Sequence, residues 1–515
     1  MTLDGSAGDD NGDADVFDTG DTYTVEDALT SVGFGKFQKF LLFYAGFGLI
    51  SEAMEMMLLS FVGPSVQIFW NLSTRQESLI TSVVFVGELI GAYFWGYVSD
   101  NYGRRKGFLF TSTATAGAGL LSSFSPNYLS LLLFRFFVGF GLGGGHVLSS
   151  WFLEFVPPSN RGIWMVTFSI FWSVGSISAA SLAWAVLPSL GWRWLLLFSS
   201  LPSFVLLMFF RIVPESPRFL SIKGRTAEAL LVLEKVARSN QASLPFGTLV
   251  VDHQRMELEE IRENPVSSED DHLIVGNVKS ETVLVGEEDN KHTNKIVESG
   301  GFSAVVTLLS PDLAFSTILI WIVFFGNAFS YYGLVLLTSE LHMDLTGCSP
   351  TAAHKSPPQN SNLYKSVLLT SFAELPGLLL AALLVDRIGR KMTMASMFFS
   401  SFIFLMPLLS QQSWLFTIIL LFGARACISG SFTVIYIYTP EIYPTSVRST
   451  GVGVASSVGR LGGILCPLVA IGLLHSCHKT ISIIVFEFVM FTAGVAAILF
   501  PLETKGRQLK DAPVT

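Results

Sequence analysis

The sequence predicts an all-α polytopic membrane protein with twelve transmembrane helices arranged as two pseudo-symmetric six-helix bundles. Apolar runs of about 20 residues, the length that crosses the hydrocarbon core of a bilayer, recur along the chain. Only 14% of its 515 residues are charged, against roughly 25% in a soluble domain, and the mean hydropathy is +0.53. The two bundles are predicted by an internal repeat, in which similar motifs return 286 residues apart.

The apolar runs form two groups of six, separated by a long polar segment. A transmembrane β-barrel would instead show alternating segments of about 10 residues, which the sequence lacks. The expected spans lie near residues 38–62, 78–98, 107–124, 128–151, 163–187 and 193–212, and then near 314–337, 365–385, 392–410, 413–437, 450–473 and 480–501.

These spans divide the chain into an acidic N-terminal tail (1–36), an N-terminal bundle (37–212), a central loop (213–312), a C-terminal bundle (313–502) and a short tail (503–515). The central loop begins with helix-like sequence and then becomes polar and acid-rich, so we expect it to be partly disordered. The N-terminal tail lacks the basic and apolar regions of a cleavable signal peptide. We therefore expect the first span to act as the internal signal.

Lysine and arginine residues predict the orientation of the chain. Those in the expected loops fall mainly on one side of the membrane, which the positive-inside rule assigns to the cytoplasm. Both termini are then cytoplasmic, with the plasma membrane as the expected location and a vacuolar or vesicle membrane as the alternative. Asn71 (in NLS), Cys348 and Cys477 lie outside, where a glycan on the asparagine and a disulfide between the cysteines are open alternatives.

Several kinds of site are missing from the sequence pattern. The four cysteines have no metal-ligand spacing, and the sequence contains no nucleotide-binding loop or catalytic triad. GLGGG (Gly141 to Gly145) resembles a phosphate loop only superficially, because small residues inside a span permit close packing of helices. We therefore expect no metal, no cofactor, no nucleic-acid partner and no enzymatic activity.

The internal repeat links two pairs of motifs. GYVSDNYGRRKG follows the second span and ALLVDRIGRKMT follows the eighth, so that Asp100 and Asp386 are 286 residues apart. EFVPPSNR follows the fourth span and EIYPTSVR the tenth, each with seven positions from acid to arginine. Two six-span halves related by parallel duplication are typical of transporters that hold their substrate between the halves at mid-membrane.

These motifs resemble those of the major facilitator superfamily. Gly96-x3-Asp100-x2-Gly103-Arg104-Arg105 resembles the signature loop of this family between its second and third spans. Arg135-Phe-Phe-Val-Gly139-Phe-Gly141 resembles its fourth-span motif. Pro214-Glu-Ser-Pro-Arg218 resembles the PESPR segment of its sugar and organic-ion branches. YTVEDALTSVGFGKFQ (Tyr23 to Gln38) resembles the start of the synaptic-vesicle-two-related branch. Overall, the chain looks most like the plant organic cation/carnitine transporter 7 type, a clade of nicotinate transporters.

The resemblance implies the major facilitator fold, alternating access and a conformational latch that breaks and reforms as the halves rock. Glu154 with Arg161, and Glu441 with Arg448, are the acid–arginine pairs that we expect to join it. The alternative is that these charges only fix the topology. The expected latch residues are Gly96, Asp100, Gly103, Arg104, Arg105, Glu154, Arg161, Asp386, Arg390, Glu441 and Arg448.

Two carboxylates interrupt the first span. Glu52 and Glu55 are three residues apart and therefore lie on one face of a helix. A charge at the centre of a span costs about 2.5–3.5 kcal/mol on insertion scales, so such residues are functional candidates. In related sugar–proton symporters an acid of the first span pairs with the arginine of the fourth-span motif, which is Arg135 here. We expect Glu52 with Arg135 to couple transport to protons and Glu55 to support them; the alternative is a static charge pair.

Arg460, in the eleventh span, bears on the substrate. It resembles a site at which organic cation transporters carry aspartate and organic anion transporters carry arginine. A guanidinium suits a carboxylate, so we expect an anionic or zwitterionic substrate, unless Arg460 is permanently paired with Glu374 or another acid. Polar aromatic and amide side chains of the seventh and tenth spans could bind a flat ring. Together with Arg460 and Glu374 they are the expected substrate-binding residues: Asn327, Tyr331, Tyr332 and Tyr436.

Together these observations predict a secondary active transporter, monomeric and proton-coupled, that moves a small organic ion by alternating access. The expected substrate is an aromatic monocarboxylate such as nicotinate, with protons and the lipid bilayer as the other partners. One alternative is a transporter of carnitine or other organic cations. Another, from a different class, is a membrane glycoprotein or sensor that does not transport.

Overall fold

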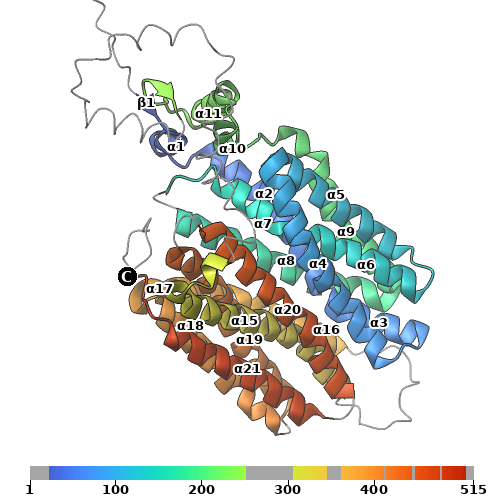
Figure 1. Ribbon diagram of the computed structural model, residues 1–515. Coiled ribbons are helices and arrows are strands. Elements are labelled where there is room, and N and C mark those ends of the chain that lie inside the picture. The colour runs from blue at the N-terminus through green and yellow to red at the C-terminus, as the bar shows by residue number, and fades with distance from the viewer. Residues whose placement is uncertain are drawn as a thin grey trace, which may run out of the picture.

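The computed structural model describes residues 22–158, 161–250, 306–344, 361–410, 412–443, 447–475 and 478–505. Eleven helical segments within these ranges are long and apolar enough to cross a membrane. A further helix, α5 (Arg104–Ser123), is less apolar and completes the twelve-helix architecture that the sequence predicts. Figure 1 shows the first half of the chain and the second half as two groups of roughly parallel helices, side by side.

The N-terminal bundle contains six spans, and two of them are interrupted. The first is formed by α2 and α3, with Leu58 between them, and the fourth by α6 and α7, with Gly143 and Gly144 between them. The bounds are α2 (Lys36–Met57), α3 (Leu59–Trp70), α4 (Thr74–Tyr102), α5 (Arg104–Ser123), α6 (Tyr128–Leu142), α7 (Gly145–Leu153), α8 (Arg161–Leu190) and α9 (Trp192–Met208), followed by η2 (Phe210–Ile212).

The C-terminal bundle repeats this plan, with an interruption at Ala373 in its second span. Its helices are α15 (Pro311–Asp344), α16 (Ser361–Phe372), α17 (Glu374–Ile388), α18 (Arg390–Leu405), η3 (Met406–Leu409), α19 (Trp414–Ile442), α20 (Arg448–His475) and α21 (Lys479–Leu499). Each interrupted span carries a buried charge, namely Glu55, Arg135 or Glu374. Broken helices at membrane depth are tolerated where protein surrounds them.

Glycines bring helices of the N-terminal bundle into backbone contact. A Cβ at Gly139 of α6 would collide with the carbonyl oxygen of Val84 in α4, and one at Gly143 would lie 2.5 Å from the carbonyl oxygen of Glu88. On the other helix, a Cβ at Gly87 or Gly91 would meet the backbone of α6. Small residues therefore set the close approach of α4 and α6, as is common inside membranes, and GLGGG has this packing role.

The two bundles meet along two main helix pairs. α4 packs against α20, and α8 packs against α16 and α17. These are the second span of each half against the fifth span of the other. Ser82 of α4 donates a hydrogen bond to the carbonyl oxygen of Ile464 in α20 at 2.9 Å. Residues on α4, α8, α17 and α20 are thus placed at the boundary between the halves.

A small folded unit covers one end of the N-terminal bundle (Figure 1). It contains α1 (Val25–Val32), α10 (Pro217–Ile222), α11 (Thr226–Asn240) and the parallel two-residue strands β1 (Thr22–Tyr23) and β2 (Thr248–Leu249). Glu26 of α1 accepts from Arg161 of α8 at 3.1 Å and from Arg218 of α10 at 2.8 Å. The described parts of the expected tail and central loop therefore fold against each other, although the expected five-region division stays a prediction.

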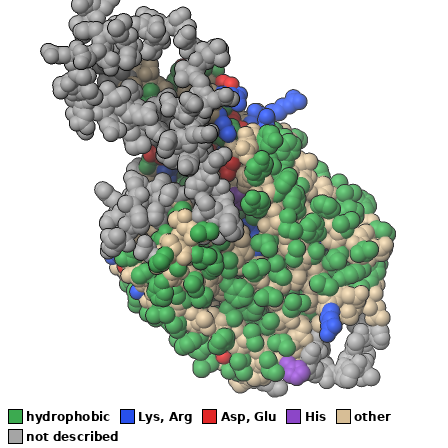
Figure 2. All heavy atoms as spheres, viewed as in Figure 1, with side chains coloured by type: hydrophobic (Ala, Val, Ile, Leu, Met, Phe, Trp, Pro, Cys, Tyr) green, Lys and Arg blue, Asp and Glu red, His purple; other side chains and the backbone are tan. Residues whose placement is uncertain are grey.

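The surface has two contrasting parts. Figure 2 shows apolar side chains over the helical body, while the coloured Lys, Arg, Asp and Glu side chains gather mainly toward the upper end of the helical body in this view. Large apolar side chains face outward on many helices; Tyr93 is 84% exposed and Met208 is 74% exposed. Exposed apolar area on this scale marks a surface that lipid covers.

Candidate functional site

Arg135 and Glu55 form a fully buried ion pair inside the N-terminal bundle. Nη1 of Arg135 donates to Oε2 of Glu55 at 3.2 Å, and both side chains are 0% exposed. The hydroxyl of Ser199, on α9, donates to Oε1 of the same carboxylate at 2.9 Å. The first, fourth and sixth spans are therefore joined through Glu55.

This pairing differs from the expected one, in which Arg135 pairs with Glu52. The expected contact is wrong for this conformation because three residues of helix rotate the two carboxylates by about 60° and separate them by about 4.5 Å along the axis. Glu55 is the one that faces α6 and α9. Both acids do lie on one side of α2, but they meet different neighbours.

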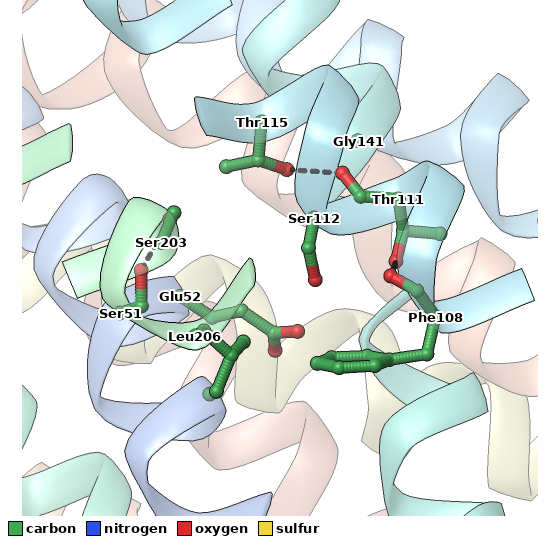
Figure 3. A pocket seen from close by; sticks show the side chains of 10 residues that line it. Ser51, Glu52, Phe108, Thr111, Ser112, Thr115, Gly141, Ser203 and Leu206 are labelled. Atoms are coloured by element: carbon green, nitrogen blue, oxygen red, sulfur yellow. Dashed lines mark hydrogen bonds between the residues drawn. The ribbon is translucent and has the colours of Figure 1, made fainter. Parts of the chain in front are cut away.

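Glu52 projects into a small hollow. Figure 3 shows its carboxylate between Leu206 and the ring of Phe108, directed toward Ser112. The hollow is lined by α2, α5, α6 and α9. Glu52 makes no hydrogen bond or ion pair with any residue of the described part of the chain, and the charges that act on it electrostatically are Glu88 and Arg460. Glu52 is therefore a carboxylate without a fixed partner among the described residues, whereas Glu55 is held by Arg135 and Ser199.

Arg460 lies at the boundary of the halves. Its Nε is 3.1 Å from Oε1 of Glu88 in α4, and its Nη1 donates to the hydroxyl of Ser456 at 2.8 Å. Ser456 is in turn 3.3 Å from the hydroxyl of Tyr436. The alternative named above is a pair of Arg460 with Glu374 or another acid; in this structure an acid does lie next to Arg460, and it is Glu88, not Glu374.

Glu374 belongs to a second polar cluster at this boundary. Its Oε1 accepts from Nη2 of Arg425 at 2.7 Å, from the hydroxyl of Tyr331 at 2.8 Å and from Ser176 of α8 at 3.2 Å. Trp172, also on α8, donates to the Tyr331 hydroxyl at 2.8 Å. The other carboxylate oxygen of Glu374 is buried and has no hydrogen-bond partner among the described residues. Donors from both halves thus converge on a single oxygen.

The other residues that the sequence assigns to the substrate have different surroundings. The ring of Tyr332 packs edge-on against Phe85 of α4, with centroids 4.7 Å apart, so it also lies between the halves. Tyr436 is 41% exposed. Asn327 is fully buried, and within the described ranges neither polar atom of its side chain has a hydrogen-bond partner.

The expected latch residues occupy equivalent places in the two halves. Gly103 and Gly389 end α4 and α17 with φ of +110° and +90°, a conformation that favours glycine. Arg104 contacts Asp100 and donates to Glu154 at 3.0 Å. In the second copy, Arg390 lies 3.9 Å from Asp386 and donates to Glu441 at 3.2 Å.

The remaining latch residues differ in part from expectation. The partner of Glu154 is Arg104, while Arg161 pairs with Glu26, so the expected pair of Glu154 with Arg161 is wrong here. The acid of the second pair, Glu441, contacts Arg390, and the side chain of Arg448 lies outside the described residues. Arg105 stacks its guanidinium 4.8 Å from the ring centroid of Phe210. Gly96 leaves space next to Nε2 of His146.

Two acids that the sequence analysis did not assign lie next to the expected latch residues, one in each half. Glu215, in PESPR, accepts from the backbone N–H of Arg105 at 3.0 Å, and Glu503 accepts from those of Arg390 and Lys391 at 2.8 and 3.1 Å. A carboxylate at a helix N-terminus accepts hydrogen bonds from the free N–H groups there and is stabilised by the helix dipole. Burial raises the pKa of Glu215, and the N–H groups around it oppose that rise. The motif PESPR could have indicated this role, since it ends a span as PLETKG does.

Asn71 and the two outer cysteines complete the expected sites. Asn71 is exposed at the turn after α3, with a left-handed φ of 53°. Cys348 and Cys477 lie outside the described residues. The glycan and the disulfide therefore stay predictions.

Two six-helix halves, with buried charges along the boundary and matching polar motifs at one end, define a multi-pass membrane transporter. Comparison with known proteins agrees. The family model "Sugar (and other) transporter" matches residues 28–275, and "Major Facilitator Superfamily" matches residues 318–513. The chain belongs to the major facilitator superfamily.

Relatives cover nearly the whole chain. It is 58% identical over 490 residues to organic cation/carnitine transporter 7 of Arabidopsis thaliana, covering 95% of this chain and 96% of that protein. It is 36% identical to the synaptic vesicle 2-related protein of Xenopus laevis, covering 96% and 83% of the two chains. These relatives agree with the branch that the sequence motifs indicate.

Solved structures support the fold. The inward-open xylose transporter XylE from E. coli matches with a TM-score of 0.63 at 17% identity, covering 92% of this chain and 98% of that one. Its partially occluded inward-open form matches with a TM-score of 0.64 at 16% identity, covering 92% and 99%. At this identity the likeness concerns the fold alone.

Proposed function

We propose that this transporter moves a small organic anion together with protons, with an aromatic monocarboxylate such as nicotinate as the substrate. The observation that carries the proposal is the position of Arg460, a guanidinium at the boundary of the two halves whose Nε–H makes no hydrogen bond with the described residues. A planar fork of N–H donors binds a carboxylate with two parallel hydrogen bonds.

The surroundings of Arg460 suit a flat ring. Tyr436 reaches Ser456, which accepts from Arg460, and the ring of Tyr332 packs edge-on against Phe85 at the same boundary. Aromatic walls with a few fixed polar groups are the usual composition of a small-molecule site. Asn327 and the Tyr331–Glu374 cluster supply further polar groups in the C-terminal half.

Glu52 is our candidate for the proton carrier. A carboxylate that lacks a fixed partner and faces a hollow can change its protonation as its surroundings change, whereas Glu55 is held by Arg135 and Ser199. We assign the Glu55–Arg135 pair a supporting role, in which it holds the first span while Glu52 loads and releases the proton.

Alternating access would use the latch. Arg104 and Arg390 each join an acid of the preceding helix to an acid at the end of the fourth span of their half. Rocking of the halves requires these contacts to rearrange. We further propose that the chain works as a monomer, with the latch end in the cytoplasm and the plasma membrane as its location.

A second candidate is the transport of carnitine or another organic cation. It is favoured by Glu52, a carboxylate with no partner among the described residues, and by the name of the Arabidopsis relative. Carnitine carries both a quaternary amine and a carboxylate, which match the charges of Glu52 and Arg460.

The test is uptake of labelled nicotinate, carnitine and tetraethylammonium by proteoliposomes, with and without an inward proton gradient. We expect saturable nicotinate uptake that the gradient increases. R460D should abolish it, and E52Q should abolish accumulation while leaving exchange. Carnitine uptake without nicotinate uptake would favour the second candidate, and gradient-driven accumulation by E52Q would remove Glu52 from the coupling step.

A further inference from the structure

The contact between Glu88 and Arg460 is the ion pair that joins the two bundles in the described part of the chain. The other membrane-embedded pairs, Glu55 with Arg135 and Glu374 with Arg425, each lie within one half. Glu88 is on α4 and Arg460 on α20, the two helices that form one of the main contacts between halves. Any rocking motion that separates α4 from α20 must break this pair.

Glu88 occupies the same place in its half as Glu374 does in the other. The two are 286 residues apart, as are Asp100 and Asp386. Each faces the fifth span of the opposite half: Glu374 contacts Ser176 of α8 at 3.2 Å, and Glu88 contacts Arg460 of α20 at 3.1 Å. The pseudo-two-fold axis therefore relates two carboxylates that both reach across the boundary.

The two carboxylates differ in what neutralises them. Glu374 has Arg425 of its own half at 2.7 Å. The position 286 residues before Arg425 is Gly139, and a side chain there would collide with the backbone of α4. Glu88 has no ion-pair partner from its own half among the described residues, so it depends on Arg460 for a counter-charge.

The pair is incompletely bonded. Oε2 of Glu88 is buried without a hydrogen-bond partner in the described structure, and Nε of Arg460, although close to Oε1, makes no well-aligned hydrogen bond. The hydrogen bond that Arg460 does make is to Ser456, on its own helix. A free carboxylate that binds Arg460 through two aligned bonds would therefore be a better partner than Glu88 is.

We propose that Glu88 is an internal competitor that occupies Arg460 between transport events and that the carboxylate of the substrate displaces. Displacement removes the ion pair between α4 and α20, so that binding of substrate releases the two halves. This inference rests on the proposed function, since it takes Arg460 as the substrate's anion site. It makes Glu88 a residue that sets affinity for carboxylates.

The first experiment compares equilibrium binding of labelled nicotinate to the purified full-length protein and to E88Q. Without a competing charge, E88Q should bind nicotinate about tenfold more tightly or better, which corresponds to about 1.4 kcal/mol. Affinity for nicotinamide, which lacks the charge, should be unchanged. E487Q is the matched control, because Glu487 is a buried carboxylate of α21 without an ion pair to the described residues; its affinity for nicotinate should equal that of the wild type. Equal affinity of E88Q and the wild type for nicotinate would overturn the competition.

The second experiment measures the contact between halves without relying on a substrate. Cysteines replace Ser82 and Ile464, which meet across α4 and α20, in a chain whose four native cysteines are replaced. E88Q should slow disulfide formation between the two cysteines severalfold. In the cysteine variant that keeps Glu88, nicotinate should slow disulfide formation as well. If nicotinate binds neither form and E88Q still slows the cross-link, the proposed substrate fails while Glu88 keeps its role between halves. An unchanged cross-linking rate in E88Q would refute that role.

Discussion

Replacing Arg135 by methionine should destabilise the N-terminal bundle severely, and a second substitution at Glu55 should restore much of the loss. Both side chains are 0% exposed, so no solvent screens the charge that a single substitution leaves behind. After loss of Arg135, Glu55 keeps only the hydrogen bond from Ser199. Breaking one side of a buried ion pair costs about 3–5 kcal/mol, and we expect a cost in that range for R135M.

The double variant E55Q/R135M carries no buried charge at this position. Replacement of a whole buried pair by neutral groups is often close to neutral, so we expect the double variant to be more stable than either single variant. The coupling energy from the double-mutant cycle should be about 2–3 kcal/mol. The assay is unfolding of the purified protein in mixed micelles, followed by tryptophan fluorescence.

The matched cycle uses E52Q in place of E55Q. Glu52 makes no contact with Arg135, and separate sites usually add within about 0.5 kcal/mol. We therefore expect a coupling energy below that value for Glu52 and Arg135. Coupling between Arg135 and Glu52, with additive effects for Arg135 and Glu55, would refute the assignment of partners.

Three further predictions concern the end of the molecule that carries the latch. R104Q should slow transport severalfold with little change in substrate affinity, because Arg104 joins Asp100 to Glu154 far from Arg460; a large loss of affinity in a binding assay would contradict this. E26Q should increase protease cleavage near α11, since Glu26 joins α1 to Arg161 and Arg218, and unchanged cleavage kinetics would show that the ion pairs contribute little. Burial raises the pKa of Glu215 above its ordinary value of 4.5, so ionisation of this carboxyl disfavours the folded state as pH rises through that value. The melting temperature of E215Q should therefore rise relative to that of the wild type between about pH 4 and pH 7. A difference in melting temperature that does not change with pH would rule this out.

The fold was predictable because its signals are local or periodic. Long apolar runs predict spans from length alone, and the repeat at 286 residues predicts two halves. The span that apolarity describes least well is α5, whose sequence TSTATAGAG is rich in small and hydroxyl residues. This helix packs against α6 and α9, and a side chain at Gly141 of α6 would collide with Thr115 of α5. Such a helix is recognised from its position in the repeat better than from its hydropathy.

The site was predictable in its residues but less so in its pairs. Intramembrane charges identify themselves by their cost, and Glu52, Glu55, Arg135, Glu374 and Arg460 were found in this way. Which acid meets which arginine depends on helix rotation and on breaks such as Leu58, which the sequence does not give. Glu88 is another such intramembrane charge, and its spacing to Glu374 indicates that the two are equivalent, because the repeat that relates the latch motifs also relates these two carboxylates.

The difference between the halves follows from a single packing choice. At equivalent positions the C-terminal half has Arg425 and the N-terminal half has Gly139. Arg425 neutralises Glu374 from within its own half, whereas the glycine lets α6 lie against α4 and leaves Glu88 to a cation of the other half. The counter-charge of Glu374 is therefore independent of how the halves are placed, whereas that of Glu88 is not. In the proposed mechanism this asymmetry makes a symmetric fold responsive to an anion, because among the described residues it is the contact between α4 and α20 that has an ion pair for a carboxylate to break.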